Sequence, residues 1–151
     1  MIALKNLKDD ILTLTAKGAL SVADNLDAQP VTLTGYLTAI QVQCGVVGVD
    51  GTGSPTQDVI VDIKKNGTTI MATNKIKFTH TSLAVTPNTY GDLAGAAPIA
   101  VSRGDVFTLQ CTQILNGTSP TQPLNLCVAL RISRNANGNP AQIITGKLES
   151  V

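Results

Sequence analysis

The sequence has no tryptophan, two phenylalanines, two tyrosines and a single histidine, His80. Charged residues are also scarce, at 14% of the chain, whereas an ordinary globular protein has about 25%. Eleven Lys and Arg residues against ten Asp and Glu residues give a net charge of +1. A protein that neutralises several phosphates needs clustered Lys and Arg side chains, and the basic residues here are scattered. The composition therefore argues against nucleic-acid binding and against attraction to a charged membrane surface.

Motifs for catalysis and for cofactor binding are missing. General acid and base catalysis usually relies on histidine or paired carboxylates, and His80 lies in an alternating stretch typical of a surface strand or loop. The sequence contains no Gly-x-Ser-x-Gly motif, the pattern that marks a nucleophilic serine in many hydrolases. The glycines at 45–48 and 91–95 match no phosphate-binding pattern, and residues 50–54 lack the glutamate that completes a calcium loop. We expect no enzymatic activity, no metal and no cofactor.

Cysteine is rare as well. Cys44, Cys111 and Cys127 cannot all pair within one chain, and their spacing matches no zinc motif. Free buried thiols are the main interpretation. Cys111 and Cys127 lie symmetrically about residues 117–121, so the alternative is a disulfide between two antiparallel strands.

The beginning of the sequence does not resemble a secretory signal. Lys5 and Lys8 are followed at once by Asp9 and Asp10, and the apolar residues behind them alternate with threonine. The uncharged run at 28–49 is long enough to cross a bilayer, but glutamines and a proline interrupt it. We expect neither a signal peptide nor a membrane span.

Two kinds of short motif have simple structural interpretations. The sequons at 66–68 and 116–118 both contain Asn-Gly, and without a secretory signal they are interpreted as hairpin turns. Residues 103–105 spell the integrin-binding tripeptide Arg-Gly-Asp. Their position directly before the alternating stretch at 106–115 favours a turn that starts a strand.

Apolar and polar residues alternate with a period of two in four stretches, which is typical of β-strands. These stretches are 36–44, 59–64, 106–115 and 124–133. The first of them would place Tyr36, Thr38, Ile40, Val42 and Cys44 on one face. Nineteen threonines and seven prolines agree with an all-β chain. The predicted core residues are Ile40, Val42, Val61, Ile63, Leu109, Leu126, Val128 and Leu130.

The two ends of the chain differ from this middle part. Residues 1–14 place leucine and isoleucine at helical spacing, while residues 11–15 fit a strand equally well. We predict an N-terminal arm at 1–28, a central domain at 29–134 and a C-terminal arm at 135–151. Because exposed apolar arms would be covered by a partner, the predicted partner-binding residues are Ile2, Leu4, Leu7, Ile11, Leu12, Leu14, Ile143 and Ile144.

Charge is absent from three long stretches, residues 28–49, 81–91 and 106–130. A monomer usually needs mixed surface charge to stay in solution, and the cores of protein interfaces are depleted in charge. This pattern favours a permanent assembly. The alternative is a neutral, threonine-rich surface that is hydrated through its hydroxyl groups.

Three segments carry a family resemblance: Pro-Val-Thr-Leu-Thr-Gly at 30–35, the strand and Lys-Asn-Gly-Thr hairpin at 59–70, and Arg-Gly-Asp-Val-Phe-Thr-Leu at 103–109. The pattern Asp-x-x-x-Asn-Gly-Thr is formed by Asp62, Asn66, Gly67 and Thr68. Together these segments resemble the jelly-roll domains of structural proteins of tailed bacteriophages. The resemblance covers about residues 30–134 and is shared by capsid decoration proteins and by fibre or receptor-binding components of tails.

The resemblance implies a jelly-roll β-sandwich of about eight strands with extended arms at both ends. It implies a homotrimer. A compact single domain with apolar arms at both ends resembles a cement protein, so we predict that it binds the major capsid protein on the outer surface of the capsid as a decoration, or cement, protein. The protein would be part of the virion and would assemble in the host cytoplasm. No nucleic acid, membrane or cofactor is expected to take part.

Two other functions remain open. A receptor-binding module of a tail fibre would recognise its ligand through the loops at 45–57 and 80–98, which are rich in Gly, Thr, Pro and Asn. A glycan-cleaving virion enzyme would need two carboxylates about 5 to 9.5 Å apart. Its candidate residues are Asp50, Asp58 and Asp92.

Overall fold

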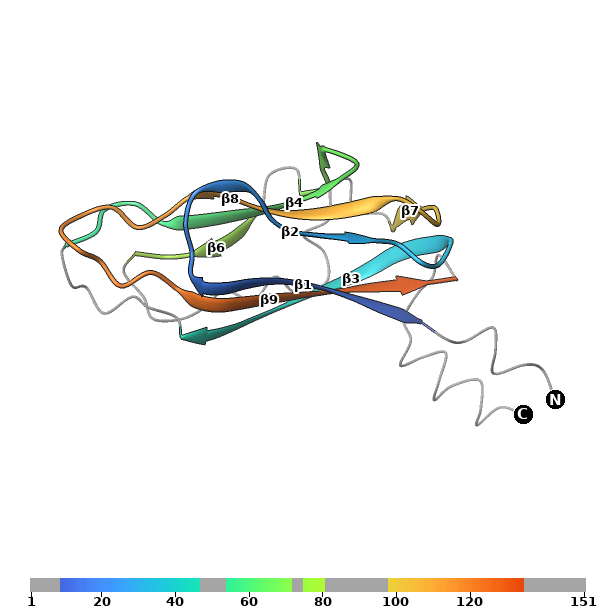
Figure 1. Ribbon diagram of the computed structural model, residues 1–151, viewed down its shortest axis with the longest axis horizontal. Coiled ribbons are helices and arrows are strands. Elements are labelled where there is room, and N and C mark those ends of the chain that lie inside the picture. Colours follow the sequence, from blue (N-terminus) through green and yellow to red (C-terminus); the bar gives the residue numbers. More distant parts are fainter. Residues whose placement is uncertain (1–8, 47–53, 72–74, 81–97, 135–151) are drawn as a thin grey trace.

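The computed structural model describes residues 9–46, 54–71, 75–80 and 98–134, except for the side chains of residues 45 and 46 (Figure 1). The described residues form nine β-strands and no helix, which confirms the all-β prediction. The strands are β1 (Asp10–Ala19), β2 (Ala23–Pro30), β3 (Gly35–Val46), β4 (Val59–Lys65), β5 (Thr68–Thr69), β6 (Ile76–Phe78), β7 (Ile99–Val101), β8 (Val106–Gln113) and β9 (Leu124–Ser133).

The strands form two sheets, in which all paired strands are antiparallel. The first, named here the β9 sheet, has the order β1-β9-β3-β7. The second, named the β8 sheet, has the order β2-β8-β4-β5, and β6 pairs with the beginning of β4 on the side that β5 occupies further along. Figure 1 shows the sheets as two layers. The predicted β-sandwich is therefore confirmed.

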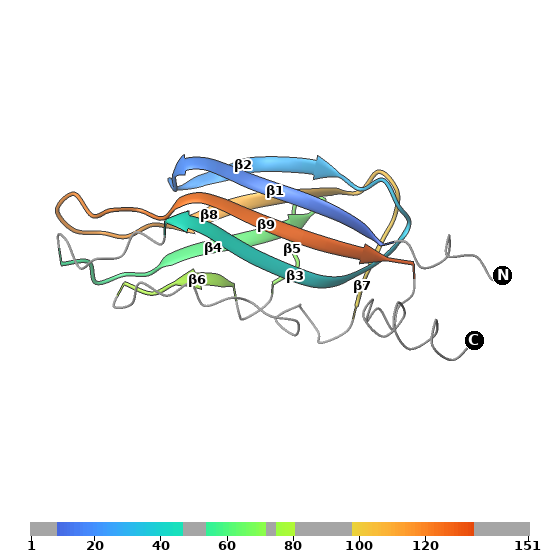
Figure 2. The same cartoon turned by 90° about the horizontal axis from the view of Figure 1, so that it is seen from below.

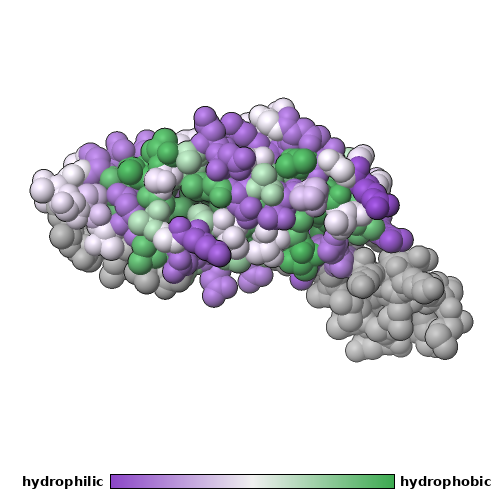
Figure 3. Space-filling view, in the orientation of Figure 1, coloured by the Kyte–Doolittle hydropathy of each residue, from purple (hydrophilic) through white to green (hydrophobic). Residues whose placement is uncertain are grey.

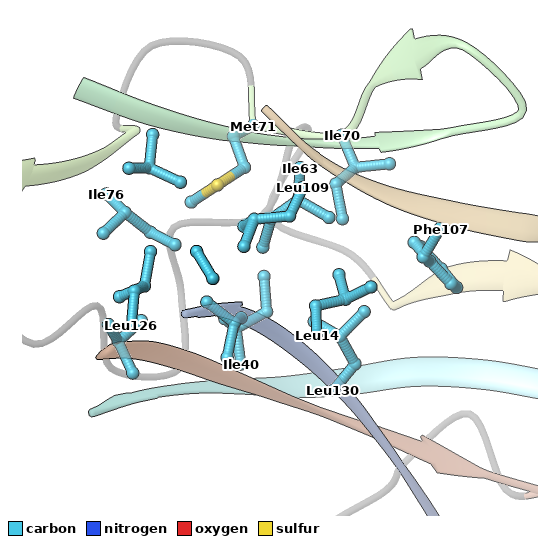
Figure 4. Close-up of a cluster of buried hydrophobic side chains, with 14 of the residues drawn as sticks. Leu14, Ile40, Ile63, Ile70, Met71, Ile76, Phe107, Leu109, Leu126 and Leu130 are labelled. Atoms are coloured by element: carbon cyan, nitrogen blue, oxygen red, sulfur yellow. The ribbon is translucent and has the colours of Figure 1, made fainter. Parts of the chain in front are cut away.

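The core lies between the two sheets. Every second residue of β9, from Leu126 to Ile132, is at most 1% exposed. Figure 4 shows Ile63 and Leu109 of the β8 sheet directed toward Leu14 of the β9 sheet. Removing apolar surface from water contributes roughly 25 cal/mol per Å², so this alternation drives the sheets together. All eight predicted core residues are buried, namely Ile40, Val42, Val61, Ile63, Leu109, Leu126, Val128 and Leu130.

Strand β3 departs from the simple alternation that the sequence suggests. Its register with β9 shifts between Leu37 and Ala39, and Leu37 is fully buried. Because a β-bulge inserts one extra residue, Leu37 and Ile40 both face the core although three positions separate them. The prediction that Tyr36 shares the core face of Ile40 is therefore wrong.

The predicted hairpin at Asn66 and Gly67 is confirmed. Their φ angles are 49° and 83°, the positive values that a two-residue hairpin turn of type I′ requires. Lys65 pairs with Thr68 across the turn. The Asn66 Oδ1 atom also accepts a hydrogen bond of 2.8 Å from the backbone N–H of Val106, so the hairpin is tied to the start of β8.

The second Asn-Gly pair does not form a hairpin. The connection that contains it joins Gln113 of β8 to Leu124 of β9, and these strands belong to different sheets. The Asn116 Oδ1 atom instead accepts hydrogen bonds from the backbone N–H groups of Thr56, at 2.7 Å, and Gln57, at 2.9 Å. The hairpin prediction is wrong here, because the chain uses this segment to cross between the layers.

The predicted N-terminal arm at 1–28 is wrong from residue 10 onward, because β1 and β2 are strands of the sandwich. Leu14 and Ala16 are buried, and Leu12 packs against the core. Every second side chain of this strand, at Leu12, Leu14 and Ala16, is directed toward the core while the strand pairs with β9. This pairing gives backbone N–H and C=O groups of β1 and β9 hydrogen-bond partners. The first described strand of the sandwich thus begins at Asp10. Residues 1–8 and 135–151 lie outside the described residues.

The two ends of the sandwich differ in what they contain. Asp10 pairs with Ile132, so β1 begins where β9 ends (Figures 1 and 2). We name this the terminal end, and it also holds the connections at 31–34, 66–67 and 102–105. The opposite, loop end holds the connections at 20–22, 54–58 and 114–123.

Candidate functional site

The outer face of the β9 sheet is poor in charged side chains. Its side chains alternate with the buried ones, so β1, β9 and β3 each contribute every second residue. Figure 2 looks onto these three strands. The outer face consists of Ile11, Thr13 and Thr15 of β1, Cys127, Ala129 and Arg131 of β9, and Ala39, Gln41 and Gln43 of β3.

This face contains a shallow depression of about 220 Å³. It lies where Ala39 and Ala129, two short side chains, stand among the longer Ile11, Gln41 and Arg131. Ile11 is 50% exposed and is one of two large hydrophobic side chains that are exposed in the described residues. An apolar side chain thus stands at the rim of a hollow with an alanine floor.

The outer face carries few charges. Arg131 is the one charged side chain among these nine, and the Arg131 Nε atom lies 3.9 Å from the Asp9 Oδ2 atom. Lys17, two positions after Thr15 in β1, is exposed as well. Threonine hydroxyls and glutamine amides both donate and accept hydrogen bonds. These groups can therefore meet a polar, uncharged surface. Figure 3, which shows the sandwich with both layers edge-on, has hydrophobic residues scattered among hydrophilic ones.

The predicted partner-binding residues fall into three groups. Ile11 is exposed on the outer face, and its partner-binding role stays a prediction. Leu14 is fully buried and Leu12 packs against the core, so their assignment to an arm is wrong because they hold the two sheets together. Five others lie outside the described residues, namely Ile2, Leu4, Leu7, Ile143 and Ile144.

The sequence analysis missed the depression itself. Four of its lining residues come from β3 and β9, which are far apart in the chain and pair side by side in the sheet. They are Ala39, Gln41, Ala129 and Arg131. The available signal was the lack of charge at 28–49, together with short side chains on the solvent face of a strand.

A cluster of charged groups at the loop end surrounds Asp58. The Asp58 Oδ1 atom lies 2.5 Å from His80 Nδ1 and accepts the His80 backbone N–H at 2.8 Å. The Lys77 Nζ atom lies 2.7 Å from Asp58 Oδ2. Burial raises the pKa of Asp58, but the hydrogen bonds from Lys77 and His80 outweigh it and bring the pKa down to about 2.

This arrangement does not suit Asp58 as the general acid of a glycan-cleaving enzyme. A general acid in glycoside cleavage needs a raised pKa, whereas that of Asp58 is lowered. The Gln113 Nε2 atom donates to the Asp58 backbone oxygen at 2.7 Å, so the residue fixes the start of β4 to β8. The other two candidate carboxylates, Asp50 and Asp92, lie outside the described residues.

Asp62, the acidic residue of the motif at 62–68, is buried on the outer side of β4. It is 2% exposed. Its carboxylate pairs with Lys75 at 2.6 Å and accepts hydrogen bonds from the Thr69 hydroxyl, at 2.7 Å, and from the Ile63 backbone N–H, at 2.8 Å. These bonds hold the β4 hairpin together, which gives the motif a structural explanation.

The Arg-Gly-Asp tripeptide forms the turn that the sequence predicted. The Asp105 backbone N–H donates to the Ser102 oxygen at 3.0 Å, and β8 begins at Val106. The Asp105 carboxylate accepts bonds of 2.8 Å from the Ser102 N–H and from Asn66 Nδ2. The hydrogen bond from Ser102, followed by that from Asn66, lowers the pKa of Asp105. The carboxylate that an integrin would need is engaged within the turn.

None of the three cysteines forms a disulfide. Cys111 faces the core of the β8 sheet, and burial raises the pKa of its thiol. The Cys44 Sγ atom donates to the Leu124 oxygen at 3.0 Å, and Cys127 lies on the outer face. The possible disulfide between Cys111 and Cys127 is therefore wrong, since β8 and β9 lie in opposite layers.

Among the described residues, no three His, Cys, Asp or Glu side chains form a group that could hold a metal ion. Within the same part of the chain, no helix has the length and apolar character needed to span a membrane. Comparison with protein-family models, with curated proteins and with solved structures found no match.

Proposed function

We propose that this protein is a structural subunit of a tailed-bacteriophage virion, which decorates the outer surface of the capsid as a homotrimer. The strand order supports the fold expected of such a subunit. A jelly roll has eight strands in two four-stranded sheets. The orders β1-β9-β3-β7 and β2-β8-β4-β5 give this arrangement when β5 and β6, which share one edge of β4, count as one interrupted strand.

The observation that carries the proposal is the pairing of the first strand with the last. Because Asp10 lies opposite Ile132, the segments at 1–9 and 135–151 are attached to neighbouring strands at one end of the sandwich. Two segments attached there can contact one surface together. After the first contact, the second forms at high effective concentration, which strengthens attachment without a large interface for either segment.

The described carboxylates also favour a structural role over an enzymatic one. Asp58, Asp62 and Asp105 are each held by several hydrogen bonds from neighbouring groups. Their bonds join strands and turns of the sandwich. A subunit that must resist the outward pressure of packaged DNA benefits from such links.

The second candidate function is recognition of a receptor through the loop end. The Asn116 side chain binds the backbone at Thr56 and Gln57, and Asp58 binds His80. These bonds bring parts of three connections together on a rigid base, as recognition loops require. Of the predicted recognition loops at 45–57 and 80–98, the structure describes residues 54–57, 80 and 98, and the backbone alone at 45 and 46.

The first experiment is quantitative mass spectrometry of purified virions of the phage that encodes this chain. A copy number near that of the major capsid protein supports decoration of the shell. A few copies per particle would move the protein to the tail and favour receptor recognition. Absence from the particle would contradict both functions.

A second experiment tests attachment directly. Capsids stripped of the protein are mixed with the full chain, with a chain lacking residues 1–8 and with a chain lacking residues 135–151. We expect both truncated proteins to fold and at least one to lose capsid binding. Full binding by both would contradict attachment through the terminal segments.

A further inference from the structure

We propose that residues 141–147 of a neighbouring copy add as an extended strand to the free edge of β1. The added strand runs antiparallel to β1 and lies along residues 11–16. This inference rests on the proposed homotrimer and names the contact that holds its subunits together.

The first observation is that β1 has unpaired backbone groups along its outer edge. The Thr15 backbone N–H donates to the Asp27 Oδ2 atom at 2.7 Å, so it points away from β9. Because the backbone groups of alternate residues in a strand point to the same side, those of Ile11 and Thr13 also point away from β9. Within the described part of the chain, these outward groups of Ile11 and Thr13 have no hydrogen-bond partner. An extended segment that lies along β1 can bind to them through its own backbone.

The neighbouring edge strand, β2, is protected against such an addition. β1 and β2 are edge strands of different sheets and lie on the same side of the sandwich (Figure 2). β2 contains Asp24, Asp27 and Pro30, and its register with β8 is irregular. Charged side chains, proline and bulges are features that block pairing at a sheet edge. Residues 11–16 of β1 have none of these features, so β1 is the edge on this side that accepts a strand.

The apolar side chains along this edge are also incompletely covered. Leu12 of β1 and Leu26 of β2 pack against the core but are only partly buried. On the other face of β1, Ile11 is 50% exposed. Because successive residues of a strand point to opposite faces, two consecutive apolar residues in the added strand would cover both sides. Ile143 and Ile144 are such a pair, and isoleucine has a high β-propensity.

The charges of the two segments match when the segments run antiparallel. Residues 11–16 are an uncharged run between Asp10 and Lys17. Residues 141–146 are an uncharged run of the same length, and Lys147 follows it. When the two runs pair antiparallel, Lys147 lies beside Asp10, whereas parallel pairing places Lys147 beside Lys17. Opposite charges across a strand pair stabilise it and like charges destabilise it, so antiparallel pairing is favoured.

The antiparallel direction indicates that the added strand comes from another copy. β9 ends at Ser133, at the same end of the sandwich at which β1 begins (Figure 1). The C-terminal segment of the same chain would reach the β1 edge from that end and would run parallel to β1. Between copies, the donor segment and the accepting edge are different surfaces, so the contact is heterologous and can close a ring. In a ring of three, each copy gives one strand and receives one.

The first test measures the mass of the full chain in solution by light scattering after size-exclusion chromatography. Thr13→Pro removes an outward N–H of β1 and leaves the hydrogen bonds to β9 in place. Thr13→Val is the matched control, because it keeps this N–H and the shape of the side chain. We expect a trimer for the wild type and for Thr13→Val, and a monomer for Thr13→Pro. Circular dichroism checks that the proteins are folded.

A substitution in the donor segment tests the same contact without changing the described sandwich, so it decides the matter if Thr13→Pro does not fold. Ile144→Lys should give a monomer, because it places a charge against the apolar side of the edge. Ser150→Lys, outside the paired run, is its matched control and should remain a trimer. A monomeric wild type would overturn the inference, and so would an oligomer that persists in folded Thr13→Pro or in Ile144→Lys.

Cross-linking identifies the copy that supplies the strand. In the proposed pairing, residue 144 lies opposite Thr13. Proteins with Thr13→Cys and with Ile144→Cys are unfolded in urea, refolded together and treated with a short bismaleimide. We expect mass spectrometry to find peptides joined between positions 13 and 144. The control replaces Thr13→Cys by Val22→Cys, at the loop end, and should give no such product. A double variant that cross-links positions 13 and 144 within a monomer would overturn the inference.

The outcomes separate this inference from the proposed function. A trimer that Ile144→Lys dissociates, in a protein that never binds capsids, would keep the strand exchange and remove the decoration role. A monomeric wild type that binds capsids would do the reverse. Two copies cross-linked between positions 13 and 144 would support the exchange and contradict the proposed trimer. A Thr13→Pro variant that stays trimeric but loses capsid binding would assign the β1 edge to the capsid protein, and would overturn the inference.

Discussion

Leu14 of β1 lies opposite Val128 of β9, and both side chains are fully buried between the two sheets. This pair joins the first strand of the sandwich to the last one. The N-terminal part of the chain is therefore a component of the core, and its removal should affect folding as well as attachment.

Leu14→Ala should lower the free energy of unfolding by about 3 kcal/mol, because it leaves a cavity at a fully buried position. Urea denaturation followed by circular dichroism measures the change. Ile11→Ala, on the exposed side of the same strand, is the control and should cost less than about 1 kcal/mol. Equal effects of the two substitutions would show that β1 does not pack as described.

Gly35→Ala should destabilise the junction of β3 and β9. A Cβ atom at residue 35 would overlap the backbone oxygen of Ser133 and lie 3.0 Å from its carbonyl carbon. Because the clash involves backbone, the strands must move apart, at a cost of about 2 kcal/mol. Urea denaturation measures the loss, and amide hydrogen exchange should show faster exchange at the ends of β3 and β9. Wild-type stability of this variant would contradict the close approach.

Asp58→Asn should lower stability at neutral pH by about 1 to 2 kcal/mol, after allowance for solvent screening of a partly exposed group. The pKa of Asp58 in the folded protein is about 2, below the ordinary value of 3.8. A lowered pKa means that the stabilisation is present above the ordinary value and is lost as pH falls through the folded value. The difference between wild type and variant should therefore shrink between pH 3.8 and pH 2.

Urea denaturation at about pH 7, 4 and 2.5, of which only the last lies between the ordinary and the folded pKa of Asp58, measures this difference. The control is Asp24→Asn, at an exposed carboxylate of β2 that accepts a hydrogen bond from Gln110. If the difference in free energy of unfolding between the wild type and Asp58→Asn stayed constant down to the lowest pH, the ion pairs of Asp58 would not stabilise the fold.

The Cys111 thiol should react with iodoacetamide only when the protein unfolds. It is 1% exposed, and burial raises the pKa of its thiol, so little thiolate is available to react. Mass spectrometry of peptides labelled at increasing urea concentration should give a labelling midpoint equal to that of unfolding. Rapid labelling in the native protein, or a peptide in which Cys111 is bonded to Cys127, would contradict the described positions.

Local patterns in the sequence were enough to predict the all-β class, the sandwich and the core. Alternation places Leu126, Val128 and Leu130 on one side of a strand whatever its neighbours are. The hairpin at 66–67 was predictable for the same reason, since asparagine and glycine adopt the positive φ angles that a two-residue turn requires. These features depend on a few consecutive residues and on backbone geometry.

The tertiary structure decided which strands are neighbours, and the sequence could not. Residues 11–15 fitted a helix or a strand equally well, and the free edge of β9 selected the strand by satisfying its backbone. Asn116 became a link between loops because β8 and β9 lie in different layers. The depression arises only where Ala39 and Ala129 come into register across two strands. Pairing between residues distant in sequence depends on the total burial and hydrogen bonding of the whole sandwich, which no local pattern contains.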